Sequence, residues 1–395
     1  MMMHLTITTK INRDTIRKYL CFTVILSFLS VNSQVTVIRN LNLALVEKDS
    51  LKSYIIENSL NGFLTEAKNG SYSNQYVDTL HLKKYEFFFN KLSGIGIETE
   101  HMSFNPPSVL KSYTPNGNDY RLTIAFTGYQ DGIPIVFQVT ELLAVPYKDY
   151  YKFYCPFEKN TANFRTKKIN DVTYRYSGTI NESKANEFSE FKDNLDELTN
   201  TTTSELIYYS FQDLDELLKS YGFLYSARQC NFLCYDLGFM DNEGQIYMTG
   251  TNNENYIFGY LGDYLYYNFP NAKDMYWPFV QGVSTYYGGY GLTYDTMEEL
   301  KQQFRNELQK NPTIDFLKEF KKGRKSSVNR HFSYYVMSAF LCEEIVNRKD
   351  FKDVLKLVYS GSRGELFFKN LKTILDVDET NFHETIVKLI SNKQL

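Results

Sequence analysis

Residues 256–291 constrain the fold of this chain more than any other stretch, and they read YIFGYLGDYLYYNFPNAKDMYWPFVQGVSTYYGGYG. Apolar and aromatic residues predict two short helices, 256–267 and 277–286, which are separated by a polar turn with Pro270 and Asn271 and followed by a glycine-rich exit. The chain before this stretch predicts both strands and helices, whereas the chain after it predicts helices only. The helix pair therefore stands where a mixed region meets a helical one.

The first region changes from a helical to an extended pattern. Apolar residues recur at spacings of three and four between 43 and 92, which predicts helices. Four segments rich in β-branched and aromatic residues then predict a meandering antiparallel sheet: 109–113, 120–127, 134–145 and 150–156. Helices followed by such a sheet predict an α+β domain over residues 34–163, and the polar stretch 158–168 is the best candidate for a linker.

The second region, residues 164–395, predicts a small sheet and then a mostly helical half. Its expected elements are a strand at 172–176, a helix from about 183, a strand at 206–209, a helix at 213–219 and an edge-type strand at 245–249. After the helix pair, Asp295-Thr-Met-Glu298 is a capping-box signature for a helix that reaches Leu308. Four more helices are expected before the end of the chain: 332–343, 351–359, 364–375 and 381–390. The predicted fold class of the whole chain is α+β.

The N-terminus predicts a secretory signal peptide, residues 1–33. A basic lead precedes an apolar run, 19–31, that is too short to span a bilayer comfortably, and cleavage is expected near Ser33. An uncleaved membrane anchor is the alternative. A cleaved signal predicts an exported protein, periplasmic or extracellular, without an integral membrane span.

Charge and cysteine content narrow the classes of function. The net charge is −3, from 43 basic and 46 acidic residues, so no global field attracts nucleic acid. Four cysteines follow the signal segment: Cys155, Cys230, Cys234 and Cys342. They could form disulfides in an exported protein, but four in a chain of this length are no disulfide scaffold, and buried thiols are the favoured interpretation. The sequence does not determine their pairing or the oligomeric state.

No recognisable catalytic set appears in the sequence. A catalytic zinc ion needs three protein donors, usually histidines and carboxylates. His81, His101, His331 and His383 include no two that stand four residues apart on a helix. A Gly-x-Ser-x-Gly nucleophile motif and a phosphate-binding glycine motif are also missing. We therefore expect no metal, no cofactor and no catalytic residue.

From about residue 164 onwards, the order of elements resembles the catalytic domain of gluzincin-type zinc metallopeptidases, particularly the secreted peptidase-like proteins of Bacteroidetes. The similar parts are the two predicted strand-and-helix units, strand 245–249, the helix pair and the helical tail. The resemblance covers a little over half of the chain, and most of it is pattern rather than identity.

The resemblance implies an emptied metal site. In that family the first central helix carries His-Glu-x-x-His, and the second carries Glu followed by Gly. Here Phe258, Gly259 and Gly262 stand at the first-helix positions and Gln281 replaces the Glu, with 18 residues between Gly262 and Gln281. Phe and Gly side chains offer no metal donor, and an amide oxygen is a weak ligand for zinc. The chain would then be a pseudopeptidase; otherwise, 256–267 is simply a buried aromatic helix with glycines at close contacts.

The resemblance also implies a degenerate active-site cleft that would bind a polypeptide or another protein. Strand 245–249 would add an extended peptide through main-chain hydrogen bonds. The side chains expected to line the cleft are Ile246, Tyr247, Met248, Tyr260, Tyr264, Trp277 and Tyr287. Phe258 and Gln281 are expected to approach each other beneath it. A non-catalytic envelope scaffold and a hydrolase with an unrecognised mechanism are the alternatives.

Overall fold

The computed structural model of this chain describes residues 38–39, 50–68, 75–93, 102–105, 107–113, 119–201, 205–226, 238–241, 244–269, 272–291, 293–328 and 331–391. The predicted signal segment, His101, Cys230 and Cys234 lie outside these residues. The chain divides into two compact units, Met1–Thr79 with Phe89–Tyr154 and Leu80–Phe88 with Cys155–Leu395. The α+β class is confirmed, with the helices mostly in the C-terminal half.

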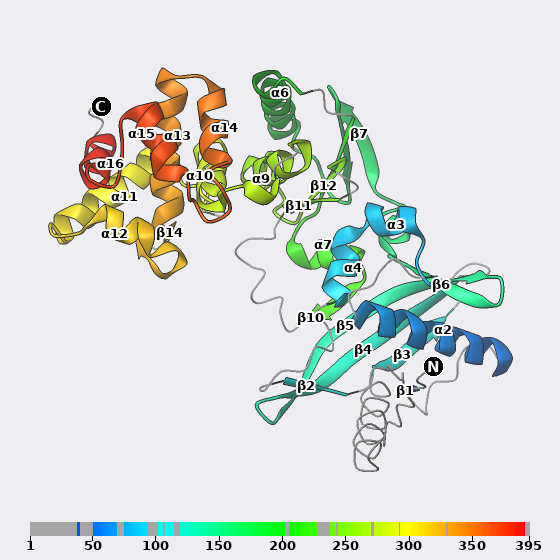
Figure 1. Ribbon diagram of the computed structural model, residues 1–395. Coiled ribbons are helices and arrows are strands. Elements are labelled where there is room, and N and C mark those ends of the chain that lie inside the picture. The colour runs from blue at the N-terminus through cyan, green and yellow to red at the C-terminus, as the bar shows by residue number, and fades with distance from the viewer. Residues whose placement is uncertain are drawn as a thin grey trace, which may run out of the picture. The chain divides into compact units, whose positions relative to one another are not determined.

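The first unit is a helix packed on a mainly antiparallel sheet (Figure 1). Its strands are β1 (Ile38–Arg39), β2 (Met102–Phe104), β3 (Ser108–Tyr113), β4 (Tyr120–Gln130), β5 (Ile133–Tyr147) and β6 (Tyr150–Tyr154). Strands β1, β3, β4 and β5 pair in that order, β2 also pairs with β4 and β6 with β5. The β4–β5 hairpin turns through Asp131 and Gly132, which both have positive φ angles, as a tight two-residue hairpin requires.

Helix α2 (Ser50–Lys68) supplies the apolar layer on this sheet. Phe63 is fully buried and stacks on Phe153 of β6 with 5.0 Å between the ring centroids. The Ser59 hydroxyl oxygen accepts a hydrogen bond from the Tyr151 backbone N–H at 3.0 Å. Two more helices follow along the chain, α3 (Thr79–Lys84) and α4 (Glu86–Ser93), and their residues 80–88 belong to the second compact unit. The predicted order of helices first and sheet afterwards is thus confirmed.

The second unit begins with a five-stranded mixed sheet. Its strands are β7 (Arg165–Ile169), β8 (Val172–Tyr176), β9 (Leu206–Ser210), β11 (Gly238–Asp241) and β12 (Ile246–Thr249), in the order β11-β12-β9-β8-β7. Strands β8, β9 and β12 run parallel, and β7 and β11 flank them antiparallel. Two predictions fail here. Residues 158–168 belong to helix α5 (Phe157–Asn160) and strand β7 rather than to a linker, and β12 is an interior strand rather than an edge.

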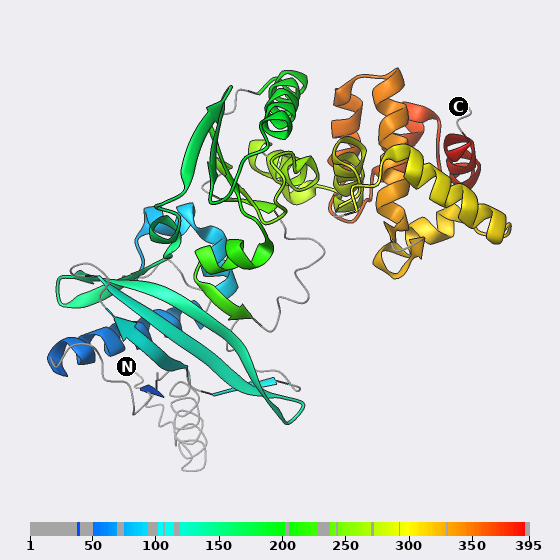
Figure 2. The same cartoon turned by 180° about the vertical axis from the view of Figure 1, so that it is seen from behind.

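Helices cover both faces of this sheet (Figure 2). Helix α6 (Glu182–Thr199) and helix α9 (Ile257–Asn268) pack on the face that carries Tyr174, Tyr208 and Tyr247, three neighbouring side chains that are fully buried. On the opposite face, α5 and helix α7 (Leu214–Ser220), which precedes the short strand β10 (Phe223–Ser226), bring aromatic rings against Tyr209 and Phe239. Tyrosine side chains therefore form a substantial part of the core around this sheet.

The helical half is built around helix α13 (Ser333–Arg348), most of whose residues are buried. The helices around it are α10 (Trp277–Gly288), α11 (Met297–Lys310), α12 (Phe316–Lys321), α14 (Phe351–Val358), α15 (Phe367–Leu375) and α16 (Phe382–Ile390), with the short elements η1 (Ala272–Asp274), η2 (Gly323–Lys325), β13 (Ser327–Val328) and β14 (His331–Phe332) between them. The capping box exists one residue later than predicted: Thr296 and Glu299 exchange backbone and side-chain hydrogen bonds. None of the helices that the structure describes has both the length and the apolar character to cross a bilayer.

Candidate functional site

Helices α9 and α10 form the antiparallel pair that the sequence predicts. At one end, Gly288 of α10 lies so close to α9 that an added Cβ would stand 2.4 Å from the Phe258 backbone nitrogen. Further along, a Cβ added at Gly262 would lie 3.8 Å from Val280 and 3.9 Å from the Gln281 amide nitrogen. The two helices thus pack through glycines at two levels.

Of the four positions at which the resemblance places metal-site residues, Gly262 and Gln281 face each other across this pair. Phe258 lies at the other level, beside Gly288, and its ring stands 6.4 Å from Tyr290 and 6.3 Å from Tyr256. The expected approach of Phe258 to Gln281 is therefore not supported: Gly262 faces Gln281, and Phe258 lies beside Gly288.

This donor set does not fit a zinc ion. Phe258 and Gly262 carry no donor atom, and Gln281 offers a neutral amide oxygen. Within the described part of the chain, no three His, Cys, Asp or Glu side chains gather as a metal site would require. The Gln281 Oε1 and Ser284 Oγ atoms of α10 are buried without a hydrogen-bond partner among the described residues.

Gly259 has a different role from Gly262, although both belong to helix α9. A Cβ at Gly259 would stand 2.6 Å from the Tyr247 hydroxyl and 2.6 Å from the Tyr256 ring. Tyr247 is fully buried in β12 and donates a hydrogen bond to the Tyr256 carbonyl oxygen at 3.1 Å, so it cannot move aside easily. A glutamate at position 259 would have no room in this packing.

Five of the seven side chains expected to line a cleft are instead part of the core. Ile246, Tyr247, Met248, Tyr260 and Tyr264 are at most 4% exposed. They are buried because β12 pairs on both sides and α9 packs on its face. Tyr287 is half-buried, and Trp277 alone is exposed, at 41%.

Strand β11, rather than β12, forms this edge of the sheet. Helix α9 already covers part of it: the Asp263 carboxylate accepts a hydrogen bond from the Met240 backbone N–H at 2.8 Å, and the Tyr267 hydroxyl lies 3.5 Å from the Met240 carbonyl oxygen. Since the outward main-chain groups of Met240 are taken, this edge does not offer a free strand for peptide addition at that residue.

A polar pocket of about 370 Å³ lies at the carboxyl end of β12. Its lining comes from α6, from the loop after β12, from the end of α10 and from the turn before α11: Lys184, Glu187, Thr251, Asn252, Asn253, Asn255, Gly288 and Tyr294. The carboxyl ends of parallel strands are where α/β sheets commonly bind ligands. Sequence reasoning missed this site; the run Thr251-Asn-Asn-Glu-Asn255 directly after a strand was the available signal.

A buried polar cluster lies on the other face of the sheet. Asp241 of β11 is 1% exposed and accepts hydrogen bonds from the Tyr221 hydroxyl at 2.6 Å and the Phe87 backbone N–H at 3.2 Å. Burial raises the pKa of Asp241 to about 7, although both hydrogen bonds act against the shift. Burial also raises the pKa of the Cys155 thiol well above its usual value.

The cysteines and two of the histidines that the structure describes contribute to packing and to main-chain hydrogen bonding. Cys155 and Cys342 are buried free thiols, as the sequence favoured. The His81 Nε2 atom accepts a hydrogen bond from the Cys155 backbone N–H at 2.9 Å, and the His383 Nδ1 atom accepts one from the Phe316 N–H at 3.2 Å. Each imidazole thus satisfies a main-chain donor of a neighbouring segment.

Comparisons with known proteins identify no relative. No family model, no curated protein and no solved structure matches this chain.

Proposed function

We propose that this chain is an exported, catalytically inactive protein with a peptidase-like frame, and that it binds a polypeptide or protein partner beside the emptied metal positions. The observation that carries this proposal is the pairing of Gly262 with Gln281 across α9 and α10. The two residues stand where the resemblance puts a histidine and a glutamate that would share a metal ion. Glycine offers no donor atom, and the glutamine amide offers only a weak one.

The packing around Gly259 supports the loss of catalysis independently of the metal donors. Metal-assisted peptide hydrolysis needs a general base beside the metal-bound water. The Tyr247 hydroxyl fills the space that a side chain at position 259 would need. Restoring a glutamate would therefore require the sheet to change as well, which supports an inactive protein over an enzyme that lost a single residue.

An exposed aromatic surface next to Gly262 supports partner binding. The Trp277 ring is among the nearest neighbours of Gly262, since a Cβ added there would stand 3.8 Å from it, and the Trp277 side chain is 41% exposed. Tyr266, one helical turn beyond Gly262 on α9, is 46% exposed. Exposed Trp and Tyr side chains are enriched among residues that dominate binding energy in protein interfaces. We name Trp277 and Tyr266 the aromatic pair.

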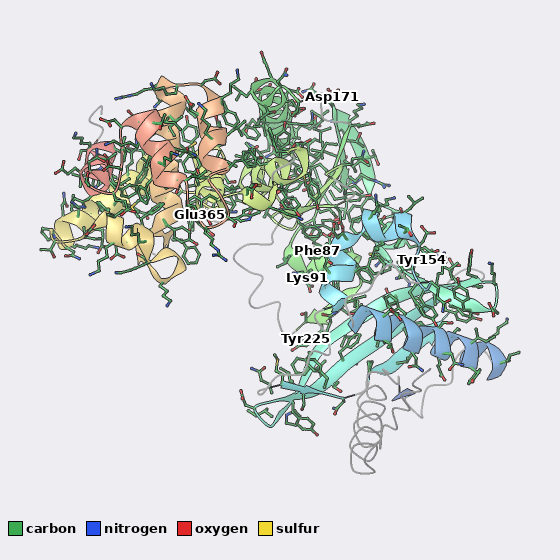
Figure 3. All side chains as sticks on the ribbon, in the orientation of Figure 1. Phe87, Lys91, Tyr154, Asp171, Tyr225 and Glu365 are labelled. Carbon is green, nitrogen blue, oxygen red and sulfur yellow. The ribbon has the colours of Figure 1, made fainter. Side chains whose placement is uncertain are left out.

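Peptide-display selection on the purified chain tests this proposal. Peptides that bind should lose at least about tenfold in affinity when Trp277 or Tyr266 is changed to Ala, because truncating an anchor in an interface removes about 1.4 kcal/mol or more. Tyr225 of β10 is also 46% exposed and is the matched control (Figure 3). Tyr225→Ala should leave binding unchanged.

Two results would reject the proposal. Stoichiometric zinc in the native purified protein, or hydrolysis of peptides that a chelator abolishes, would show an active metal site. Peptides that bind Trp277→Ala as tightly as the native chain would place the binding surface elsewhere.

A further inference from the structure

The polar pocket after β12 is held by fixed elements. Thr251 Oγ1 lies 2.8 Å from Thr249 Oγ1, the Asn252 backbone N–H donates to the Phe211 carbonyl oxygen at 3.0 Å, and Asn253 is 8% exposed. The Asn255 side-chain amide donates to Glu187 of α6 at 3.0 Å. The loop is therefore tied to both the sheet and helix α6, and its polar side chains have defined positions.

Several polar groups of this pocket have unused hydrogen-bonding capacity. Lys184 Nζ, the Asn252 amide and the Tyr294 hydroxyl make no hydrogen bond or ion pair with any residue in the described ranges. The Asn255 Oδ1 atom is buried and has no partner among them either. Asn255 Oδ1 is the buried atom among these groups, and buried polar atoms nearly always find a partner, whereas Lys184 and Asn252 are exposed and Tyr294 is 40% exposed. These four groups offer both donors and acceptors to a ligand.

Two of the seven non-glycine residues with positive φ in the described ranges line this pocket. Asn252 and Tyr294 both have positive φ angles, 50° and 52°. Asn tolerates this conformation, but it is a genuine outlier for a bulky aromatic residue such as Tyr. Strain of this kind clusters at ligand-binding positions. Tyr294 is 40% exposed, and its ring meets the buried Tyr256 ring edge-on at 6.4 Å, so it presents an aromatic surface at the pocket.

We propose that this pocket binds a neutral saccharide, with a sugar ring against Tyr294 and its hydroxyl groups bonded to Asn252, Asn255 and Lys184. Sugar hydroxyls both donate and accept hydrogen bonds, as the free groups of the pocket require. The charges of Lys184 and Glu187 have opposite sign, so the pocket has no strong preference for an anion or a cation. The volume of about 370 Å³ lies within the usual range of small-molecule sites.

This inference is independent of the emptied metal site, because none of Phe258, Gly259, Gly262 and Gln281 lines the pocket. It also concerns a different surface from the aromatic pair. Loss of peptide binding would therefore leave it standing, and its own failure would leave the proposed function untouched.

Saturation-transfer NMR and calorimetry on the full chain test the proposal, with glucose, galactose, mannose, N-acetylglucosamine, maltose and cellobiose as probes. At least one of these sugars should bind. Its affinity should fall at least about tenfold in Asn252→Gly and in Tyr294→Gly, because each variant removes a ligand contact. Glycine suits the positive φ at both positions, so the backbone should not be strained further.

Asn170→Gly is the matched control. Asn170 also has a positive φ angle, 49°, but it lies in the β7–β8 turn away from the pocket residues. It should bind the sugar as the native chain does. The proposal is overturned if none of the sugars binds at about 10 mM. It is equally overturned if sugar affinity survives both pocket variants, or if unrelated peptides compete for the pocket.

Discussion

Two glycines of helix α9 show how a single position can exclude or admit a side chain. Gly259 is closed by the Tyr247 hydroxyl and the Tyr256 ring, whereas the nearest atoms to a Cβ at Gly262 stand at ordinary van der Waals distance, 3.8 Å. From the sequence, close packing at both glycines is the alternative to the emptied metal site. The sequence cannot separate them, because the difference comes from a tyrosine on β12 that reaches α9 only in the folded chain.

Alanine should therefore have opposite effects at these two positions. We expect Gly259→Ala to lower the free energy of unfolding by about 1–3 kcal/mol through overpacking against Tyr247. We expect Gly262→Ala to raise it by up to about 1 kcal/mol, since alanine is the better helix former and the space is free. Urea denaturation of both variants, each the control for the other, measures the difference. Equal effects would contradict the packing described for α9.

Asp241 predicts a pH dependence of stability. Its pKa is about 7 in the folded chain against 3.8 for the ordinary carboxyl group, because burial disfavours the charge. The folded state thus holds its proton more strongly. This proton therefore contributes to the free energy of unfolding, and its contribution is fully present below about pH 4 and is lost as the pH rises through about 7. The whole loss is on the order of 4 kcal/mol.

Asp241→Asn should remove this dependence, since an amide does not titrate, although its single oxygen can replace only one of the two carboxylate oxygens that accept from Tyr221 and Phe87. Urea denaturation at about pH 5 and about pH 8 compares the two forms. Asp171, an exposed residue in the β7–β8 turn, provides the control Asp171→Asn (Figure 3). If Asp241→Asn shows the same loss of stability with rising pH as the native chain, Asp241 is not the group responsible.

At the scale of elements, most strands and helices could be predicted, but their neighbours in the sheet could not. Hydrophobic periodicity places β8, α6, β9 and α7 close to their observed bounds. The pattern of 245–249 does not reveal that β11 pairs beside it, since pairing depends on segments distant in sequence. The expected peptide-binding edge fails for that reason, and with it five of the seven expected cleft residues.

The capping box of α11 gives an element-scale prediction. Thr296 Oγ1 accepts from the Glu299 backbone N–H, and the Glu299 carboxylate accepts from the Thr296 N–H at 2.8 Å. Thr296→Ala should lower the free energy of unfolding by about 1 kcal/mol. Thr373→Ala, at an exposed position inside α15, should change it much less. Denaturation curves in which both variants behave alike would show that the cap contributes nothing.

At the scale of the whole molecule, the chain divides into two compact units, and the second comprises Leu80–Phe88 as well as Cys155–Leu395, whereas the sequence placed the division at 163–164. The polarity of 158–168 predicted a linker, but Phe157 directly before this stretch is buried and Arg165–Ile169 forms a sheet edge. Composition could not show this, because an edge strand with one exposed side is itself polar.

The proposed function rests on one premise: helices α9 and α10 keep the arrangement of a zinc-binding helix pair, but the residues at the metal positions no longer bind zinc. The most direct test returns zinc donors to those positions in one variant, Phe258→His with Gly262→His and Gln281→Glu, and measures bound zinc by elemental analysis. Phe258→His with Gly262→His alone is the control for adventitious binding by two histidines. Circular dichroism and thermal melting establish that both variants are folded.

We predict about one zinc ion per chain in the triple variant, less in the control and none in the native protein, because three protein donors are the usual minimum for such a site. A folded triple variant that binds no more zinc than the control would contradict the frame, and with it the account of this protein as an emptied peptidase.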